Sequence, residues 1–380
     1  MKKICFVVSS PMSVNAFLLP HLRFLSRSYE VHLVVNSKID SMPQIGGLPI
    51  YVTSVSIRRD VDFLADLSAM IFLYRFFRQN RFDLVSSFTP KAGALGMVAS
   101  WLAGVPSRVH WFTGQVWATR RGLSRWVYRT ADRLTATLAT HALVDSNSQR
   151  EFLLGEQILT TARSEVLCDG SVCGVDLERF QPNATSFYNV RKELGVPSEA
   201  LILLYVGRLT VDKGLLDLVS AFSELVESKK NLWLLLVGPD EQNIESRIRA
   251  VARPSVESRL LNVGYSRHPE RYMAAADIFC LPSYREGFGS SVIEAAGCGL
   301  PAVVSKIYGL VDAVSAGETG LLHPPGDISA IVAALDKLLS DHDLRRRMGA
   351  NARKRVVEKF SQERLTTSLS SFYLRTLQKL

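Results

Sequence analysis

The sequence contains no uninterrupted apolar stretch of about 18 residues, so it predicts no transmembrane helix. Its five cysteines are odd in number and lack the paired spacing of a zinc site, which favours a reduced, cytoplasmic compartment. The first apolar run ends within a few residues at Ser9-Ser10-Pro11, too soon for a signal peptide. We therefore expect a buried first strand there.

Two familiar nucleotide-binding motifs are also missing. The P-loop pattern Gly-x4-Gly-Lys-Ser/Thr does not occur, and no G-x-G-x-x-G follows the first strand. The similar string Gly287-Phe288-Gly289 continues as Ser-Ser-Val and fails the second pattern. These absences disfavour a hydride-transfer enzyme.

The charge is basic and uneven. The formal net charge is +9; residues 1–180 hold 20 Lys and Arg against 14 Asp and Glu, and residues 181–380 hold 25 against 22. The excess in the first half suggests an anionic partner, either lipid headgroups or an acceptor phosphate. No nucleic-acid-binding motif accompanies this charge, so we expect no nucleic-acid partner.

Short apolar runs alternate with segments long enough for helices, which is typical of a parallel sheet wrapped by helices. The runs are residues 4–8, 31–35, 84–87, 108–112, 142–144, and then 201–206, 232–237, 260–263, 278–281, 302–305 and 320–323. Two doubly wound α/β domains follow. Residues 168–194 have no clear periodicity and are expected to contain the linker, with the boundary near 180.

One stretch, residues 283–301, concentrates chemistry. It follows the apolar run 278–281 and leads into a predicted helix whose unpaired amides suit an anion. Gly287 and Gly289 let a backbone come close to a ligand, and Ser290 can cap the helix.

Two carboxylates, Glu286 and Glu294, accept hydrogen bonds and suit a polyhydroxylated ligand. On spacing alone, an ordinary glycine-rich turn with two unrelated Glu residues is an alternative. The string Arg-Glu-Gly-Phe-Gly-x4-Glu-Ala-x3-Gly-x-Pro, however, resembles the E-x7-E signature of the retaining glycosyltransferases of family 4. The resemblance implies the GT-B fold, two Rossmann-like domains facing a central cleft, with Glu286 by the donor sugar and Glu294 on the ribose. It places the turn in the substrate site: Gly287, Phe288, Gly289, Ser290 and Ser291.

The turn after the run 201–206 carries two cations, Arg208 and Lys213, beside Gly207 and Gly214. A solvated basic turn is the alternative, but the string resembles the G-R-L-x4-K-G motif of the same family. Arg208 and Lys213 would then stabilise the leaving nucleoside diphosphate, with no metal or other cofactor required. Glu286 as a covalent nucleophile is chemically reasonable, but we favour a front-face substitution in which the donor phosphate helps deprotonate the acceptor.

The sequence departs from the family pattern in places. Thr113 occupies the usual position of a sugar-binding histidine, and His110 is better explained as a core or edge residue. Asp312 takes the place of the usual acid of a G-G-x-x-E string near the sugar. Gly264 and Tyr265 are candidates for the base pocket, with structural packing as the alternative.

Residues 101–133 contain four of the five tryptophans, and Arg121, Arg125, Arg129 and Arg133 recur every four residues. Such a basic stripe beside aromatics suits an anionic membrane surface, while core aromatics with solvated arginines are the alternative. Part of this segment resembles enzymes of surface-polysaccharide assembly.

We therefore expect residues 1–180 to bind the acceptor, residues 181–360 to bind the nucleotide sugar, and residues 361–380 to form a helix that crosses back. The expected reaction moves a hexosyl or N-acetylhexosaminyl group from a nucleoside diphosphate sugar onto an undecaprenyl-diphosphate-linked O-antigen or capsule saccharide at the inner face of the membrane. The sequence does not identify the sugar, and UDP is the default nucleotide. The rivals are a nucleotide-sugar epimerase and a catalytically silent partner subunit.

Overall fold

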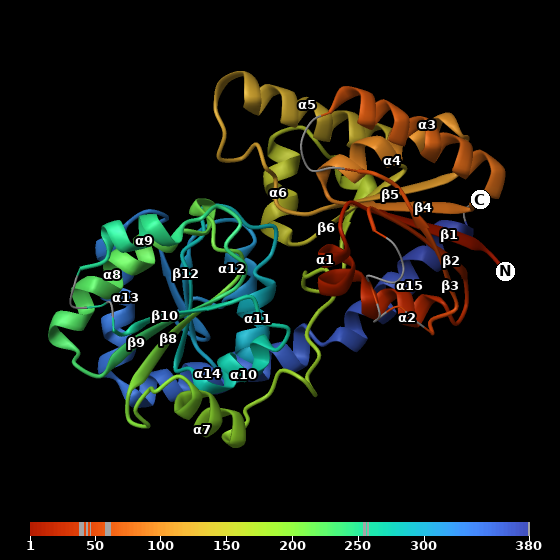
Figure 1. The fold of residues 1–380 in the computed structure, drawn as a ribbon. Helices are drawn as coiled ribbons and strands as arrows, with labels where there is room; N and C mark the ends of the chain where they lie inside the picture. The colour runs from red at the N-terminus through yellow and green to blue at the C-terminus, as the bar shows by residue number, and fades with distance from the viewer. Residues whose placement is uncertain are drawn as a thin grey trace. The chain divides into compact units, whose positions relative to one another are not determined.

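The computed structural model describes residues 1–37, 42, 45, 47–57, 62–253, 256 and 258–378. It contains two compact units: unit 1 comprises Met1–Cys173 with Gln362–Leu380, and unit 2 comprises Gly174–Ser361 (Figure 1). Each unit is a parallel sheet covered by helices, so the predicted pair of doubly wound domains is confirmed.

In the described part of unit 1, seven parallel strands form one sheet in the order β3-β2-β1-β4-β5-β6-β7. They are β1 (Lys3–Val8), β2 (Glu30–Val35), β3 (Ile50–Ser54), β4 (Leu84–Phe88), β5 (Ser107–Phe112), β6 (His141–Val144) and β7 (Ser164–Val166). Alternate residues of β1 face two cores, since Phe6 packs into one and Cys5 and Val7 into the other. Burial of both faces explains the continuous apolar runs of these strands.

The helices of unit 1 form two layers. The three helices α3 (Phe63–Asn80), α4 (Pro90–Leu102) and α5 (Gly122–Leu138) lie on one face, with α4 in contact with both others (Figure 1). The C-terminal α15 (Gln362–Gln378) packs against α2 (Leu19–Leu25), and its Tyr373 hydroxyl bonds Ser86 Oγ at 2.8 Å. Lys379 and Leu380, included in the predicted last helix, lie outside the described residues. The remaining helices are α1 (Pro11–Ser13), η1 (Val14–Leu18), α6 (Asn147–Gly155) and η4 (Thr161–Arg163).

Unit 2 has six parallel strands in the order β10-β9-β8-β11-β12-β13. They are β8 (Leu201–Val206), β9 (Leu232–Val237), β10 (Leu260–Gly264), β11 (Ile278–Leu281), β12 (Ala302–Ser305) and β13 (Gly320–His323). The helices are α7 (Ala184–Glu193), η5 (Val211–Lys213), α8 (Leu215–Ser228), α9 (Glu245–Val251), α10 (Pro269–Ala275), α11 (Ser290–Gly297), α12 (Leu310–Ala313), α13 (Ile328–Ser340) and α14 (His342–Lys359).

The units change at Cys173, a few residues before the boundary expected near 180. The reason is that Val175 pairs with Ser361, and Phe180 is buried in the core of unit 2. Residues 174–194 of the segment expected to contain the linker therefore belong to unit 2. Within the described ranges, no helix is both long and apolar enough to cross a bilayer.

Candidate functional site

The two motif-bearing turns of unit 2 meet at one edge of its sheet. Gly207 follows β8 directly, the 283–289 turn follows β11, and these two parallel strands are paired at Leu203 and Ile278. The chain places β9 and β10 on one side of β8 and β11 to β13 on the other. The turns therefore flank the point where strand order reverses, which is where open α/β sheets bind ligands.

Lys213 and Glu286 form an ion pair at this point. The Lys213 Nζ lies 2.5 Å from Glu286 Oε1, and the Ser283 hydroxyl donates to the same oxygen at 2.9 Å. Both charged side chains are largely buried. Two residues predicted from separate motifs therefore form one cluster.

Arg208 lies beside a carboxylate that the sequence did not reveal. Its guanidinium donates to Glu241 Oε2 at 2.9 Å, and the Tyr205 hydroxyl donates to its carbonyl at 2.7 Å. Burial works against its charge, but the bond to Glu241 and the nearby carboxylates of Asp212 and Glu286 raise the pKa of Arg208. The Tyr205 hydroxyl thereby fixes the backbone of the turn at Arg208, and Glu241 fixes the position of the Arg208 guanidinium.

A second pair supports the same turn. Arg285 donates to Asp212 Oδ2 at 2.8 Å, and the Thr210 hydroxyl donates to Asp212 Oδ1 at 2.5 Å. Burial raises the pKa of Asp212, but the Thr210 bond and neighbouring cations outweigh it and lower that pKa. Sequence reasoning missed Arg285 and Asp212 although each adjoins a predicted residue, Glu286 and Lys213.

The glycine-rich turn is shaped by packing as well as by any ligand. A Cβ at Gly289 would lie 2.8 Å from Leu310 Cδ2 and from Val292 Cγ2, so these two side chains would have to move for a larger residue. The predicted cap by Ser290 is wrong: Gly289 is the N-cap residue of α11, without a side-chain bond, and Ser290 is the first helical residue. Phe288 is buried against Phe360, which leaves only its backbone for a ligand.

Glu294 is half-buried on α11. Burial raises its pKa to about 7, against the opposing effect of Arg179, and Glu270 raises it further. Near neutral pH this carboxyl therefore exists in both protonation states and can donate as well as accept a hydrogen bond.

Gly264 and Tyr265 lie at the end of β10, on the outer side of β9 from the ion-pair cluster. Gly264 has a φ of +74°, which favours glycine, and the Tyr265 side chain is exposed. The backbone of Gly207 packs tightly against Gly238. A Cβ on Gly238 would lie 1.8 Å from the carbonyl oxygen of Gly207.

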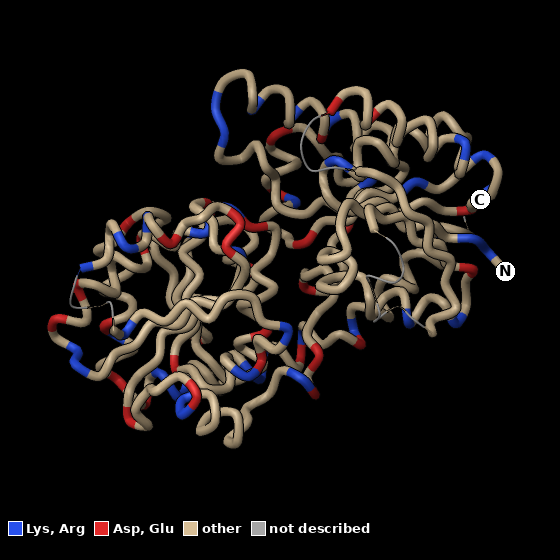
Figure 2. The backbone as a smooth tube through the Cα atoms, viewed as in Figure 1, with Lys and Arg blue, Asp and Glu red and all other residues tan. Residues whose placement is uncertain are grey.

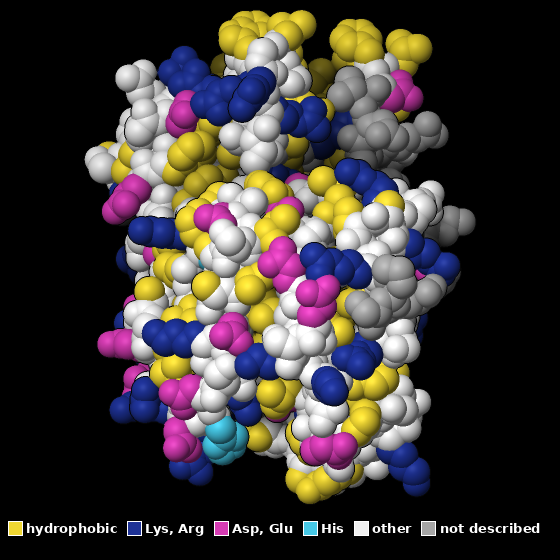
Figure 3. All heavy atoms as spheres, turned by 90° about the vertical axis from the view of Figure 1, so that its left-hand side faces the viewer, with side chains coloured by type: hydrophobic (Ala, Val, Ile, Leu, Met, Phe, Trp, Pro, Cys, Tyr) yellow, Lys and Arg dark blue, Asp and Glu magenta, His cyan; other side chains and the backbone are white. Residues whose placement is uncertain are grey.

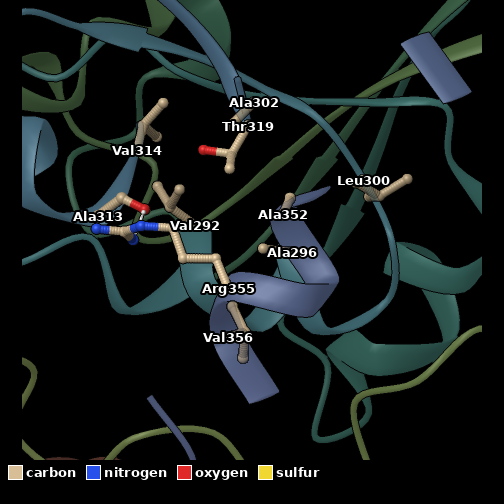
Figure 4. Close-up of a pocket in the computed structure, with 10 residues that line it drawn as sticks. All are labelled: Val292, Ala296, Leu300, Ala302, Ala313, Val314, Thr319, Ala352, Arg355 and Val356. Carbon is tan, nitrogen blue, oxygen red and sulfur yellow. Dashed lines mark hydrogen bonds between the residues drawn. The ribbon is translucent and has the colours of Figure 1, made fainter. Parts of the chain in front are cut away.

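Asp312 lies on the short helix α12. Arg355 of α14 donates to the carbonyl oxygen of Ala313 at 3.1 Å (Figure 4). It also donates to the carbonyl oxygen of Asp312 at 2.8 Å. The cavity around this arginine measures about 10 Å³, far too small for a sugar. Arg355 therefore holds α12 against α14 through backbone carbonyls and does not line a sugar site.

A larger hollow of about 460 Å³ lies at the opposite, amino edge of the sheet. Among the residues that line it, Asp277 and Pro301 directly precede β11 and β12. None of the predicted site residues lines it. In the described part of the chain, no group of three or more His, Cys, Asp or Glu residues is arranged to hold a metal ion.

Thr113 belongs to unit 1, directly after β5. Its carbonyl accepts bonds from Gln115 Nε2 at 2.6 Å and from the buried Gln149 Nε2 at 2.8 Å, so two glutamines that the sequence did not single out fix this turn. His110 is a core residue, as predicted. It lies 2.8 Å from Ser87 Oγ, and burial lowers its pKa to about 3.

The four arginines of the predicted basic stripe lie on or at the start of α5, and the two in the middle are ion-paired. Arg125 and Arg129 bind the Glu156 carboxylate at 2.7 and 2.9 Å, so both charges are already paired. Of the aromatic group, Trp111 and Trp117 are buried, whereas Trp101 and Trp126 are exposed.

Two family models cover most of the chain. Residues 187–355 match the model described as Glycosyl transferases group 1, and residues 21–170 match a Glycosyl transferase 4-like domain. The chain is 28% identical over 323 residues to the capsular polysaccharide biosynthesis glycosyltransferase CapM of Staphylococcus aureus, covering 84% of this chain and 83% of CapM.

Two further relatives carry informative names. The chain is 27% identical over 319 residues to a UDP-Gal:alpha-D-GlcNAc-diphosphoundecaprenol alpha-1,3-galactosyltransferase of Escherichia coli, covering 83% of this chain and 81% of that protein. It is 31% identical over 298 residues to a D-inositol 3-phosphate glycosyltransferase of Corynebacterium jeikeium, covering 70% of each.

Solved structures share the fold. A sucrose-phosphate synthase from Thermosynechococcus elongatus matches with a TM-score of 0.83 at 22% identity, over 100% of both chains. Anabaena HepE, solved with UDP and glucose, matches with a TM-score of 0.80 at 19% identity, over 98% of this chain and 99% of that one.

Proposed function

This chain belongs to the group 1 glycosyl transferases of the GT-B fold, with a glycosyl transferase 4-like N-terminal region, and from that membership we propose its reaction. It transfers a hexosyl or N-acetylhexosaminyl group from a nucleoside diphosphate sugar, UDP-linked by default, to a lipid-linked saccharide, with retention at the anomeric carbon. The observation that carries the proposal is the cluster of Arg208, Lys213 and Glu286 at the strand-order switch point. It offers cations to a diphosphate beside a carboxylate suited to sugar hydroxyls.

The relatives support the acceptor class. CapM is named for capsular polysaccharide biosynthesis, and the Escherichia coli relative is named for a diphosphoundecaprenol-linked substrate. We infer that this chain extends a bacterial surface glycan, such as an O-antigen, on undecaprenyl diphosphate. It acts as a peripheral protein at the inner face of the cytoplasmic membrane, and the basic excess of residues 1–180 suits its anionic substrate.

In the proposed mechanism, Arg208 and Lys213 turn from their carboxylate partners to the diphosphate as its bond to the anomeric carbon breaks. A phosphate oxygen of the leaving group takes the proton of the acceptor hydroxyl, which bonds to the same face of the sugar. Glu286 binds sugar hydroxyls and Glu294 binds the ribose, while the turn of residues 287–291 offers backbone N–H groups. The cations of the protein neutralise the developing charge in this scheme, which requires no metal.

The test is to supply UDP-sugars with an undecaprenyl-diphosphate-linked saccharide and to determine the anomeric configuration of the product by NMR. Transfer with retention supports the proposal. Inversion overturns the mechanism, and interconversion of the UDP-sugar without an acceptor identifies an epimerase instead. Absence of any turnover with every UDP-, GDP- or dTDP-sugar, despite nucleotide binding, favours a silent partner subunit.

A further inference from the structure

The helix α3 is apolar on two faces. Its buried residues, Leu73 and Phe77 among them, pack into the core beside the sheet. Its solvent side nevertheless carries a second group of large apolar side chains: Phe63, Leu64, Leu67, Ile71, Phe72 and Tyr74. Phe63 is 78% exposed, and the spacing 64, 67, 71 follows one side of a helix. Folding of unit 1 does not explain this second face.

The helix α5 repeats the pattern on the other side of α4. Leu123, Trp126, Val127 and Leu134 are exposed, with Trp126 at 63%. Trp101 and Leu102, at the end of α4, are exposed as well. Figure 3 shows hydrophobic side chains gathered at the upper end of the molecule, where Figure 1 places α3 and α5. Large exposed apolar patches in soluble chains mark partner or membrane contacts.

The charges around these side chains have one sign. The acids of the two helices are engaged, since Asp66 pairs with Lys91 at 2.7 Å and Asp132 accepts the Trp117 indole N–H at 2.7 Å. Among the described residues on or next to these helices, the exposed charged side chains named here are basic: Arg75, Arg78, Arg120, Arg121 and Arg133. Asp62, the N-cap residue of α3, is half-buried and accepts the Ala65 N–H. Figure 2 shows Lys and Arg in the loop before α5 and at the end of α3. This arrangement complements an anionic surface.

The most exposed apolar residues of α3 and α5 lie at the edge of unit 1 that carries Thr113. Since β3, β4, β5 and β6 are parallel, α3 and α5 both begin at the carboxyl edge of the sheet. Phe63 and Leu64 open α3, and Leu123 and Trp126 lie in the first turns of α5. Thr113 directly follows β5 at the same edge.

We propose that the exposed sides of α3 and α5 form a docking surface for an anionic phospholipid bilayer, with the first turns of both helices inserted among the lipid headgroups. The surface presents the carboxyl edge of unit 1 to a lipid-linked acceptor; that last step rests on the proposed function, whereas bilayer binding does not. Aromatic and aliphatic side chains with flanking arginines are the composition of helices that lie in a membrane interface.

The experiment is flotation of the purified full chain with vesicles of phosphatidylglycerol and phosphatidylcholine. The variant F63S/L64S/L123S/W126S should lose at least tenfold in vesicle affinity while its thermal melt stays close to that of the wild type. The matched control Leu374→Ser, an exposed leucine on α15, should bind as the wild type does. R120E/R121E should weaken binding to anionic vesicles and make the remaining binding less sensitive to salt than that of the wild type.

Three outcomes overturn the proposal. The quadruple variant floats as the wild type does; the wild type fails to bind anionic vesicles; or the wild type is a dimer that the quadruple variant converts to a monomer, which assigns the surface to a second copy of this chain. Transfer to a water-soluble acceptor analogue is unaffected by the quadruple variant if the surface serves only docking. If the wild type binds vesicles but transfers no sugar to any acceptor, the proposed function is refuted and the docking surface still stands.

Discussion

The Nζ of Lys213 lies 2.5 Å from the Oε1 of Glu286, although 73 residues separate them in the sequence. A phosphate that binds Lys213 therefore has to share or replace a carboxylate that the fold already holds there. Arg208 is in the same situation with Glu241, and Arg285 with Asp212. Each cation of the cluster thus faces a local anion, with which an anionic donor would have to compete.

Loss of either motif cation should weaken nucleotide binding. Arg208→Ala and Lys213→Ala should each raise the dissociation constant for UDP, and each missing cation should cost turnover about 2 to 4 kcal/mol of stabilisation. Isothermal titration and steady-state rates measure the two effects, with a thermal melt to establish folding. Lys229→Ala is the control, because this lysine follows α8 at the opposite edge and pairs with Asp336. Unchanged affinity in both folded variants would contradict the assignment.

Loss of the local anion should have the opposite effect. In Glu241→Gln, Arg208 keeps its charge and loses its carboxylate partner, so UDP should bind tighter by roughly two- to fivefold, the scale of a partly exposed ion pair. Titration calorimetry at low salt measures this change. Glu245→Gln, which removes an exposed carboxylate paired with Arg249, should leave the affinity as it is. Weaker binding in Glu241→Gln would mean that Glu241 orients Arg208 rather than competing for it.

The two glutamates should separate in their effects. Glu286→Gln should impair turnover without weakening UDP affinity, because its carboxylate is assigned to the sugar and the loss of its charge only frees Lys213 for the phosphate. Glu294→Gln should weaken both, because its carboxyl is assigned to the ribose. UDP titration and turnover with a saturating sugar donor distinguish the two roles. An equal loss of UDP affinity in both variants would refute this division.

Glu294 should also make stability depend on pH. Burial raises its pKa from 4.5 to about 7, so the folded protein retains a proton that the unfolded chain releases between these values. The contribution of this group to the free energy of unfolding is present at low pH and is lost as the pH rises toward 7. Melting temperatures of wild type and Glu294→Gln between about pH 5 and 7.5 test this. The wild type should decline more steeply, and parallel curves would show that the burial of Glu294 has no such effect.

Local sequence patterns were sufficient to predict the central strands. The runs at 201–206 and 278–281 became β8 and β11 almost residue for residue, because a strand buried on both faces has to be continuously apolar. The edge strands β3 and β7 were missed, since their partly exposed side chains lack that signal. His110 was correctly assigned to the core from its place inside an apolar run.

The sequence by itself determined the family, the two-domain α/β architecture and the candidate residues, because strand, turn and helix motifs span only a few neighbouring residues. Only the tertiary structure decided which charges are paired. Glu241 pairs with Arg208, which lies 33 positions earlier in the sequence. Glu156, which directly follows α6, pairs with Arg125 and Arg129 of α5. The four-residue spacing of the arginines predicts a stripe on α5, but it does not encode which neighbour covers that stripe. The second apolar face of α3 was missed for a related reason. The sequence shows that this helix carries apolar residues on more than one side. Only the packing against the sheet decides which of those sides is buried and which remains exposed to solvent.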